Sequence, residues 1–161
     1  HVLLIDGDIR NPTVHKLLGF KRTKGLREYL EKKETNLSDI MYDTVMNKLK
    51  FIPGGMPHKI PADLLSSNRM KQLIKETKER YDDRFVIIDL PPPQFTSEPH
   101  ALARLVDGII LVINYGKTSR STVKELIDNL GKEKIIGVVV NKIDPGMLTK
   151  YGYSKYKLYG Y

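Results

Sequence analysis

The sequence contains no cysteine and no tryptophan. Without cysteine, the chain has no disulfide framework, no thiolate zinc site and no cysteine nucleophile, a composition that fits a reducing cytoplasm. No apolar run approaches the roughly 18 residues that a transmembrane helix needs. The first residues, His1 to Ile5, also lack the basic leader and the cleavage site of a signal peptide.

The 161 residues have the size of one ordinary domain, and 40% of them are hydrophobic, which is enough for a core. Lysine and arginine number 27 against 19 acidic residues, so the formal net charge is +8. A basic surface attracts phosphates, acidic lipid headgroups or acidic partners without choosing among them. Most of the charges are interspersed with acids, and no basic stripe is interleaved with aromatic residues. We therefore expect no nucleic-acid partner.

Strand-like and helix-like patterns alternate along the chain. Five short apolar runs predict strands: Val2 to Ile5, Phe51 to Pro53, Phe85 to Ile88, Ile109 to Ile113 and Ile135 to Val140. The runs are continuous rather than alternating, which is typical of strands buried on both faces of a parallel sheet. Helices are expected at Arg69 to Arg80, Ser97 to Leu105 and Thr122 to Leu130, and less clearly at Pro12 to Leu18 and Leu26 to Lys33. The pattern predicts an α/β fold, an open and mostly parallel sheet flanked by helices.

The helix at Thr122 to Leu130 has the clearest end signals. Thr122 and Glu125 have the spacing of a capping box, and Gly131 follows the last apolar residue.

Polar side chains stand where three of the predicted strands end. Asp6 and Asp8 follow the first strand, Asp89 follows the third and Asn141 follows the last. Open α/β sheets bind ligands beyond the carboxyl ends of their strands. These side chains are therefore candidates for one common site.

The first of these motifs is Asp6-Gly7-Asp8-Ile9-Arg10. The two carboxylates can converge if the chain turns at Gly7. Paired carboxylates beside an arginine suit a hard cation and its phosphate ligand. The alternative is a simple Gly-Asp turn in which Asp8 caps the next helix.

The second motif, Asp89-Leu90-Pro91-Pro92, follows a hydrophobic strand and suggests a carboxylate that orders magnesium, while the prolines stop the strand. The third motif, Asn141-Lys142-Ile143-Asp144, has three possible interpretations. Asn141 could contact an adenine edge, the run could be the Asn-Lys-x-Asp pattern of guanine-binding GTPases, or the residues could form an ordinary turn.

The C-terminus is rich in tyrosine. Five of the nine tyrosines lie in the last eleven residues: Tyr151, Tyr153, Tyr156, Tyr159 and Tyr161. Their spacing fits neither a strand nor a helix. We interpret residues 146–161 as a flexible tail of exposed hydroxyl groups, following a domain at residues 1–145. The alternative is a merely adhesive tail.

In combination, these motifs resemble the bacterial tyrosine kinases of capsule and exopolysaccharide export, which belong to the P-loop ATPases that include MinD and ParA. The family's Walker A′ motif, Asp-x-Asp-x-Arg, stands at Asp6 to Arg10. Its Walker B motif, Asp-x-Pro-Pro, stands at Asp89 to Pro92, and its tyrosine cluster stands at Tyr151 to Tyr161. The segment from Ile52 through Leu65 and the helix that follows also resemble the family's middle region, so the resemblance covers nearly the whole chain.

The resemblance implies a protein-tyrosine autokinase that uses ATP and Mg²⁺. Asp8, Asp89 and Asp6 would hold the metal, and Asp6 is also the candidate for accepting the tyrosine proton. Arg10 would stabilise phosphate charge or fix the acids, and Asn141 would contact the base. The tail tyrosines would be the acceptors, phosphorylated by a neighbouring copy in a ring. The family also implies a membrane-bound polysaccharide co-polymerase as activator, and a cytoplasmic place at the inner face of the membrane.

The sequence departs from the family in one main respect. The family's phosphate loop, Gly-x-x-x-x-Gly-Lys-Ser/Thr, precedes the A′ strand, and these 161 residues do not contain it. We expect the sequence to be the C-terminal part of a longer P-loop kinase domain, without its N-terminal P-loop strand. Glu98 stands where the family often has an aspartate. Three alternatives remain open: a ParA/MinD-like ATPase, a GTPase, and a non-catalytic fragment that only presents tyrosines.

Overall fold

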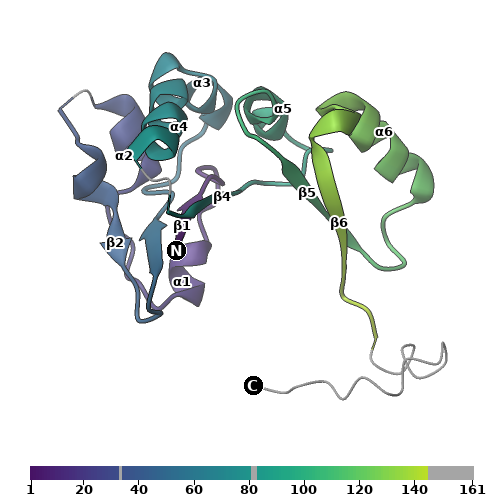
Figure 1. Ribbon diagram of the computed structural model, residues 1–161, viewed down its shortest axis with the longest axis horizontal. Coiled ribbons are helices and arrows are strands. Elements are labelled where there is room, and N and C mark those ends of the chain that lie inside the picture. Colours follow the sequence, from purple (N-terminus) through teal and green to yellow (C-terminus); the bar gives the residue numbers. More distant parts are fainter. Residues whose placement is uncertain (33, 81–82, 145–161) are drawn as a thin grey trace. The chain divides into compact units, whose positions relative to one another are not determined.

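The computed structural model describes residues 1–32, 34–80 and 83–144 (Figure 1). It divides into two compact units, His1–Val106 and a second that begins at Asp107. The predicted boundary after residue 145 and the whole tyrosine-rich tail lie outside the described residues. Within the described ranges, no helix has the length and hydropathy needed to span a bilayer.

The first unit is built on a four-stranded sheet in the order β2-β3-β1-β4. Its strands are β1 (Val2–Asp6), β2 (Tyr42–Asp43), β3 (Leu49–Ile52) and β4 (Phe85–Asp89). β1 runs parallel to both β3 and β4, and only the short β2 pairs antiparallel with β3. The predicted α/β class with a mostly parallel sheet is confirmed.

Helices pack against this sheet and bury its apolar residues. They are α1 (Val14–Leu17), α2 (Leu26–Glu31), η1 (Leu37–Ile40), α3 (Pro61–Leu65), α4 (Asn68–Arg80) and α5 (Glu98–Ala103). Met70 and Leu73 of α4 share the core with Leu3 and Ile5 of β1, because three-residue spacing places both on one helix face. The helices predicted near residues 69–80 and 97–105 are confirmed. The sequence patterns predicted none of η1, α3 and β2.

The second unit is a parallel pair of strands joined by a helix. β5 (Ile109–Asn114) leads through α6 (Arg120–Leu130) and η2 (Lys132–Lys134) to β6 (Ile135–Asn141). The predicted capping box at Thr122 is wrong, because the N-cap is Ser119, whose hydroxyl accepts a hydrogen bond from the Thr122 N–H at 3.1 Å. The predicted end is correct: Gly131 follows α6 with φ 94°, a conformation that favours glycine.

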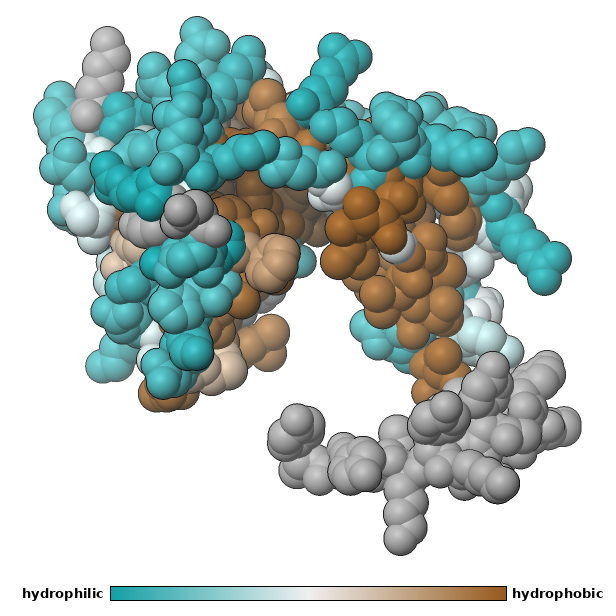
Figure 2. All heavy atoms as spheres, in the orientation of Figure 1, coloured by the Kyte–Doolittle hydropathy of each residue, from teal (hydrophilic) through white to brown (hydrophobic). Residues whose placement is uncertain are grey.

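The prediction of strands buried on both faces holds for only part of the chain. β1 is largely buried, but Phe85 of β4 is 79% exposed and Ile136 of β6 is 71% exposed. β4 is the last strand of its sheet, and the β5-β6 sheet has only two strands among the described residues. Figure 2 shows apolar side chains gathered on the surface of the second unit. The exposed ones are Ile110, Val112, Ile136, Val138, Val139 and Val140.

Candidate active site

Asp6 and Asp89 lie side by side at the carboxyl edge of the first sheet. They are register partners on the adjacent parallel strands β1 and β4. The Gly7 N–H donates to the Asp89 carbonyl oxygen at 2.8 Å, so the pairing continues one residue past β1. A Cβ at position 7 would lie only 2.8 Å from that oxygen, and the close approach therefore suits glycine. The structure brings together two of the predicted site residues.

Asp6 is fully buried, and half of its carboxylate is unsatisfied. Its Oδ2 accepts a hydrogen bond from the Val14 N–H at 3.1 Å, at the first residue of α1. Its Oδ1 is buried and has no hydrogen-bond partner. Burial raises the pKa of Asp6 to about 6; the Val14 hydrogen bond opposes this rise, and the negative charges of Asp89 and Asp8 add to it. A carboxylate with a raised pKa and a free oxygen is suited to taking up a proton or a cation.

Asp8 and Asp89 add negative charge at the same edge. Desolvation raises the pKa of Asp89, and the neighbouring charge of Asp8 raises it further. The Asp8 Oδ1 accepts a hydrogen bond from the Asn11 N–H at 3.0 Å, so Asp8 stabilises a turn, as the alternative interpretation expected. That turn does not cap α1, whose first N–H is instead satisfied by Asp6.

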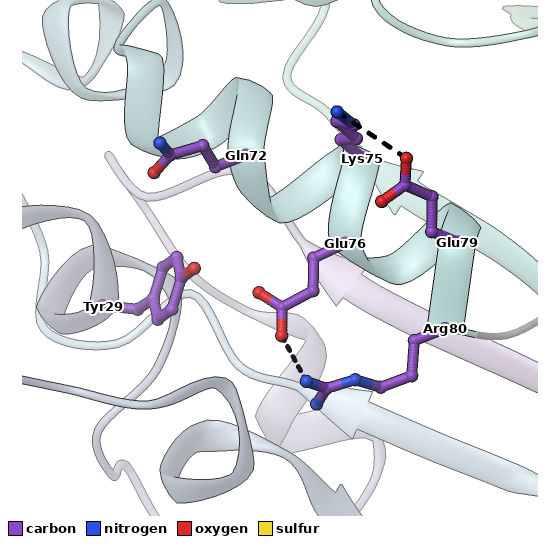
Figure 3. Close-up of a pocket in the computed structure, with 6 residues that line it drawn as sticks. All are labelled: Tyr29, Gln72, Lys75, Glu76, Glu79 and Arg80. Atoms are coloured by element: carbon purple, nitrogen blue, oxygen red, sulfur yellow. Dashed lines mark ion pairs between the residues drawn. The ribbon is translucent and has the colours of Figure 1, made fainter.

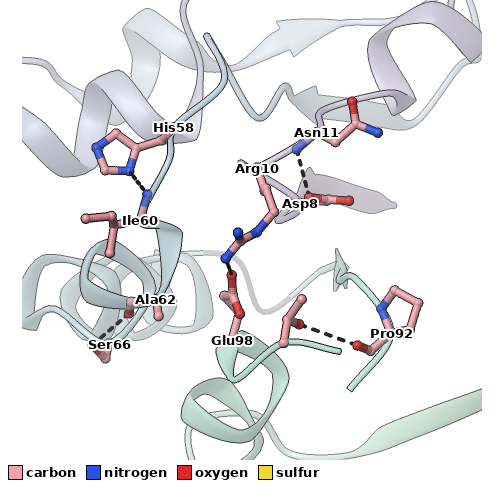
Figure 4. A network of polar contacts seen from close by, with 10 residues as sticks. Asp8, Arg10, Asn11, His58, Ile60, Ala62, Ser66, Pro92 and Glu98 are labelled. Atoms are coloured by element: carbon pink, nitrogen blue, oxygen red, sulfur yellow. Dashed lines mark hydrogen bonds and ion pairs between the residues drawn. The ribbon is translucent and has the colours of Figure 1, made fainter. Parts of the chain in front are cut away.

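The Arg10 side chain points toward Glu98 and forms an ion pair with it (Figure 4). The Arg10 Nη2 lies 3.2 Å from the Glu98 Oε1. Glu98 is the first residue of α5, and its side chain is 1% exposed, whereas that of Arg10 is 52% exposed. The Glu98 Oε2 is buried without a hydrogen-bond partner. The structure therefore adds Glu98 to the candidate site, which the motif pattern alone did not do.

The donor set fits a magnesium nucleotide better than an isolated metal ion. Among the described residues, no three or more His, Asp or Glu side chains are arranged to hold a metal by themselves. Mg²⁺ usually takes one or two protein carboxylates and completes its shell with phosphate oxygens and water. The unpartnered Oδ1 of Asp6, beside the charges of Asp8 and Asp89, provides an incomplete shell of that kind.

Comparison with known proteins gives a consistent result. No protein-family model matches the chain. The tyrosine-protein kinase CpsD of Streptococcus agalactiae is 32% identical over 160 residues, covering 96% of this chain and 67% of the relative. The chain belongs to the bacterial tyrosine-protein kinases. Another member, the tyrosine-protein kinase YwqD of Bacillus subtilis, is 34% identical over 154 residues, 94% of this chain and 64% of the relative.

Solved structures agree with membership of this kinase family. The kinase domain of VpsO superposes with a TM-score of 0.80 at 30% identity, covering 89% of this chain and 70% of that domain. The MinD protein of Pyrococcus horikoshii shares the fold, with a TM-score of 0.65 at 20% identity. The chain spans about two thirds of the length of the curated kinases that it matches.

Asn141 belongs to the second unit of this kinase-family chain. Its Oδ1 accepts a hydrogen bond from the Lys142 N–H at 2.7 Å, and Lys142 has a φ of 58°. This geometry supports the turn interpretation of the Asn-Lys-Ile-Asp run. Contact between Asn141 and a nucleotide base stays a prediction.

One hollow on the described surface lies away from the acidic edge. It is open to solvent and lined by Tyr29, Gln72, Lys75, Glu76, Glu79 and Arg80 (Figure 3). Two ion pairs along α4, Lys75 with Glu79 and Arg80 with Glu76, satisfy most of its charge. Since it contains none of the strand-end carboxylates, we do not assign the kinase-family site to it.

Proposed function

We propose that this chain carries the acidic half of the active site of an ATP-dependent protein-tyrosine autokinase. The observation that supports this most directly is the unpartnered oxygen of buried Asp6 beside its register partner Asp89. Two non-adjacent segments deliver carboxylates to one edge of a parallel sheet, where nucleotides bind in this class of fold. Membership of the bacterial tyrosine kinases supplies the reaction class.

We assign each residue of the candidate site a separate role in phosphoryl transfer. Asp89 and Asp8 would hold the Mg²⁺ of bound Mg-ATP, which would supply positive charge to the phosphoryl group during transfer. Asp6 accepts the proton of the attacking tyrosine or shares in holding the metal. A tyrosine hydroxyl has a pKa of about 10, so it is mostly protonated near neutral pH. Asp6, with a pKa of about 6, can accept that proton, which makes the tyrosine oxygen a better nucleophile. Arg10 stabilises phosphate charge from a position fixed by Glu98.

The acceptors in this proposal are the five tail tyrosines of a neighbouring copy: Tyr151, Tyr153, Tyr156, Tyr159 and Tyr161. Copies assemble into a ring and phosphorylate one another. A membrane-bound polysaccharide co-polymerase activates the kinase at the inner face of the cell membrane. The relative named succinoglycan biosynthesis transport protein ExoP, from Rhizobium meliloti, is 33% identical over 164 residues, which supports a role in polysaccharide polymerisation or export.

The test is phosphotyrosine formation in the presence of Mg-ATP. Because the chain contains no phosphate loop, it is assayed alone and joined to the part of the Bacillus subtilis kinase that the match leaves out. We expect phosphotyrosine in the joined protein, and a fall of roughly 100-fold or more for Asp6→Asn and Asp89→Asn. Asp63→Asn is the matched control, because Asp63 is exposed on α3.

Three outcomes would count against the proposal. Protection from proteolysis by GTP but not by ATP would indicate a GTPase. ATP hydrolysis without phosphotyrosine would indicate a ParA/MinD-like ATPase. If the joined protein binds no nucleotide and its tyrosines are modified only by an added kinase, the chain is a regulatory fragment.

A further inference from the structure

One stretch of the chain departs from the general mixing of charges. Residues 9–27 contain six lysine or arginine residues and no aspartate or glutamate. This stretch therefore carries a formal charge of +6, against a net charge of +8 for the whole chain. Arg10 and Arg27 are engaged by Glu98 and Glu31. The other four, Lys16, Lys21, Arg22 and Lys24, are exposed, and none forms an ion pair with another described residue.

The fold fixes the backbone that carries these four cations. Phe20 packs its ring against Tyr42 and Phe51, with ring centroids 5.9 and 5.6 Å away. The Thr23 hydroxyl lies 3.0 Å from the Tyr42 hydroxyl, which also donates to the Lys24 carbonyl oxygen at 3.3 Å. Because these anchors hold the loop against the sheet, its charged side chains are left on the outside.

Helix α1 contributes to the same surface. Val14 and His15 are its buried residues, whereas Lys16 is exposed and Leu17 is 84% exposed. The Phe20 N–H donates to the His15 carbonyl oxygen at 2.8 Å, which folds the loop directly back onto this helix. Burial lowers the pKa of His15, and the positive charges of Arg22 and Lys16 lower it further, so cations of both segments lie around it.

We propose that Lys16, Leu17, Lys21, Arg22 and Lys24, the basic surface, dock the protein directly on an anionic lipid membrane. Clustered cations near a bilayer are attracted by its negative surface potential. An exposed leucine among them can insert between the headgroups, as apolar residues of interfacial segments do. This contact is distinct from any membrane-bound protein partner.

A phosphorylated peptide is the less favoured occupant. Phosphotyrosine recognition uses cations held in a fixed geometry, most often an arginine that binds two phosphate oxygens. Among the described residues, no hydrogen bond fixes the side chains of the four cations. They line neither the hollow beside α4 nor a smaller one beside Leu37 and Lys50. An exposed leucine has no role in binding a phosphate.

The test is co-sedimentation of the full chain with protein-free vesicles of phosphatidylcholine mixed with phosphatidylglycerol. We expect binding that weakens as salt is added and that vanishes on pure phosphatidylcholine. Changing Lys16, Lys21, Arg22 and Lys24 together to Gln should weaken binding by about 100-fold or more. Leu17→Ala should weaken it by up to about tenfold without changing the charge.

The matched control removes the same charge from the second unit, through Lys117→Gln, Arg120→Gln, Lys124→Gln and Lys132→Gln. It should keep most of the binding, because acids such as Glu125, Asp128 and Glu133 lie among these cations. Unchanged far-ultraviolet circular dichroism shows that each variant is folded. Equal losses in the two quadruple variants would overturn the proposal, as would full binding by the first. The proposal would also be overturned if the first quadruple variant lost binding to a phosphotyrosine peptide but still bound vesicles as well as the wild type does. None of these readouts depends on kinase activity.

Discussion

Arg10 and Glu98 are 88 residues apart in the sequence, yet the Arg10 Nη2 lies 3.2 Å from the Glu98 Oε1. The two side chains differ in exposure: Glu98 is almost completely buried, whereas Arg10 is half exposed. The contact joins the segment after β1 to the start of α5, so it ties the acidic motif to the helix that follows β4.

This difference in exposure between Arg10 and Glu98 predicts that substitutions at the two positions have non-additive effects on stability. Arg10→Ala leaves a buried carboxylate without its cation, and we expect it to cost about 2 kcal/mol of unfolding free energy. In Arg10→Ala/Glu98→Gln the buried group is neutral, so the double variant should be more stable than Arg10→Ala alone. Urea unfolding of the four proteins of this double-mutant cycle gives the coupling energy. A coupling near zero would show that the pair does not act as a unit.

The raised pKa of Asp6 predicts a fall in stability between pH 3.8 and about 6. Within that window the unfolded chain releases the Asp6 proton while the folded chain retains it, so stability decreases as pH rises. The loss amounts to about 3 kcal/mol at most. Asp6→Asn should flatten this part of the profile and be more stable than the wild type at pH 7. Unfolding by urea from pH 4 to 7 measures it, with Asp63→Asn as control. Parallel profiles for wild type and Asp6→Asn would contradict the assignment.

The close approach at Gly7 predicts sensitivity to a single methyl group. A Cβ there would meet the Asp89 carbonyl oxygen and a Leu90 methyl carbon, each at 2.8 Å. We expect Gly7→Ala to destabilise the protein by about 1–3 kcal/mol and to lower phosphotyrosine formation by moving Asp89 away from Asp6. Gly137→Ala is the control, because its Cβ would meet nothing within 4 Å. Equal stability of the two variants would contradict this, because it would show that β1 and β4 can separate at little cost to accommodate a methyl group.

The tail predicts a link between phosphorylation and assembly. Each phosphate adds about −1.5 to −2 charges, which would make the tail, with Lys150, Lys155 and Lys157, strongly anionic. Phosphorylation should then expel the tail and loosen the ring. Changing all five tail tyrosines to Phe should keep the assembly closed in Mg-ATP. Light scattering coupled to size exclusion measures the particle mass, and a phosphate-sensitive mass in that variant would refute the idea.

The sequence predicted the features that depend on short stretches of chain. The apolar run of β1 and the aspartates at the ends of β1 and β4 follow from local patterns, and parallel pairing then brings Asp6 beside Asp89. Strand β2 was not predicted, because its two residues, Tyr42 and Asp43, are too few to form a pattern. Helix α3 begins at Pro61, and proline is common both at the first position of helices and in turns, so it was no clear signal for either.

Features that depend on distant residues could not be predicted. Nothing near Arg10 in the sequence indicates Glu98 as its partner, and the exposure of Phe85 depends on which strands flank β4. The start of α6 was misplaced for a local reason: Ser119 and Thr122 can each act as N-cap, and the extended backbone of Ser119 decides between them.

Asp6 also reaches beyond the acidic edge, because its Oδ2 receives the first N–H of α1. That short helix presents Lys16 and Leu17 to the outside. The carboxylate of the candidate active site is therefore linked to the proposed lipid-contacting residues through α1, whose first N–H lies eight residues after Asp6. If both proposals hold, occupancy of the nucleotide site and attachment to the bilayer would be reciprocally coupled, each altering the affinity of the other by the same factor.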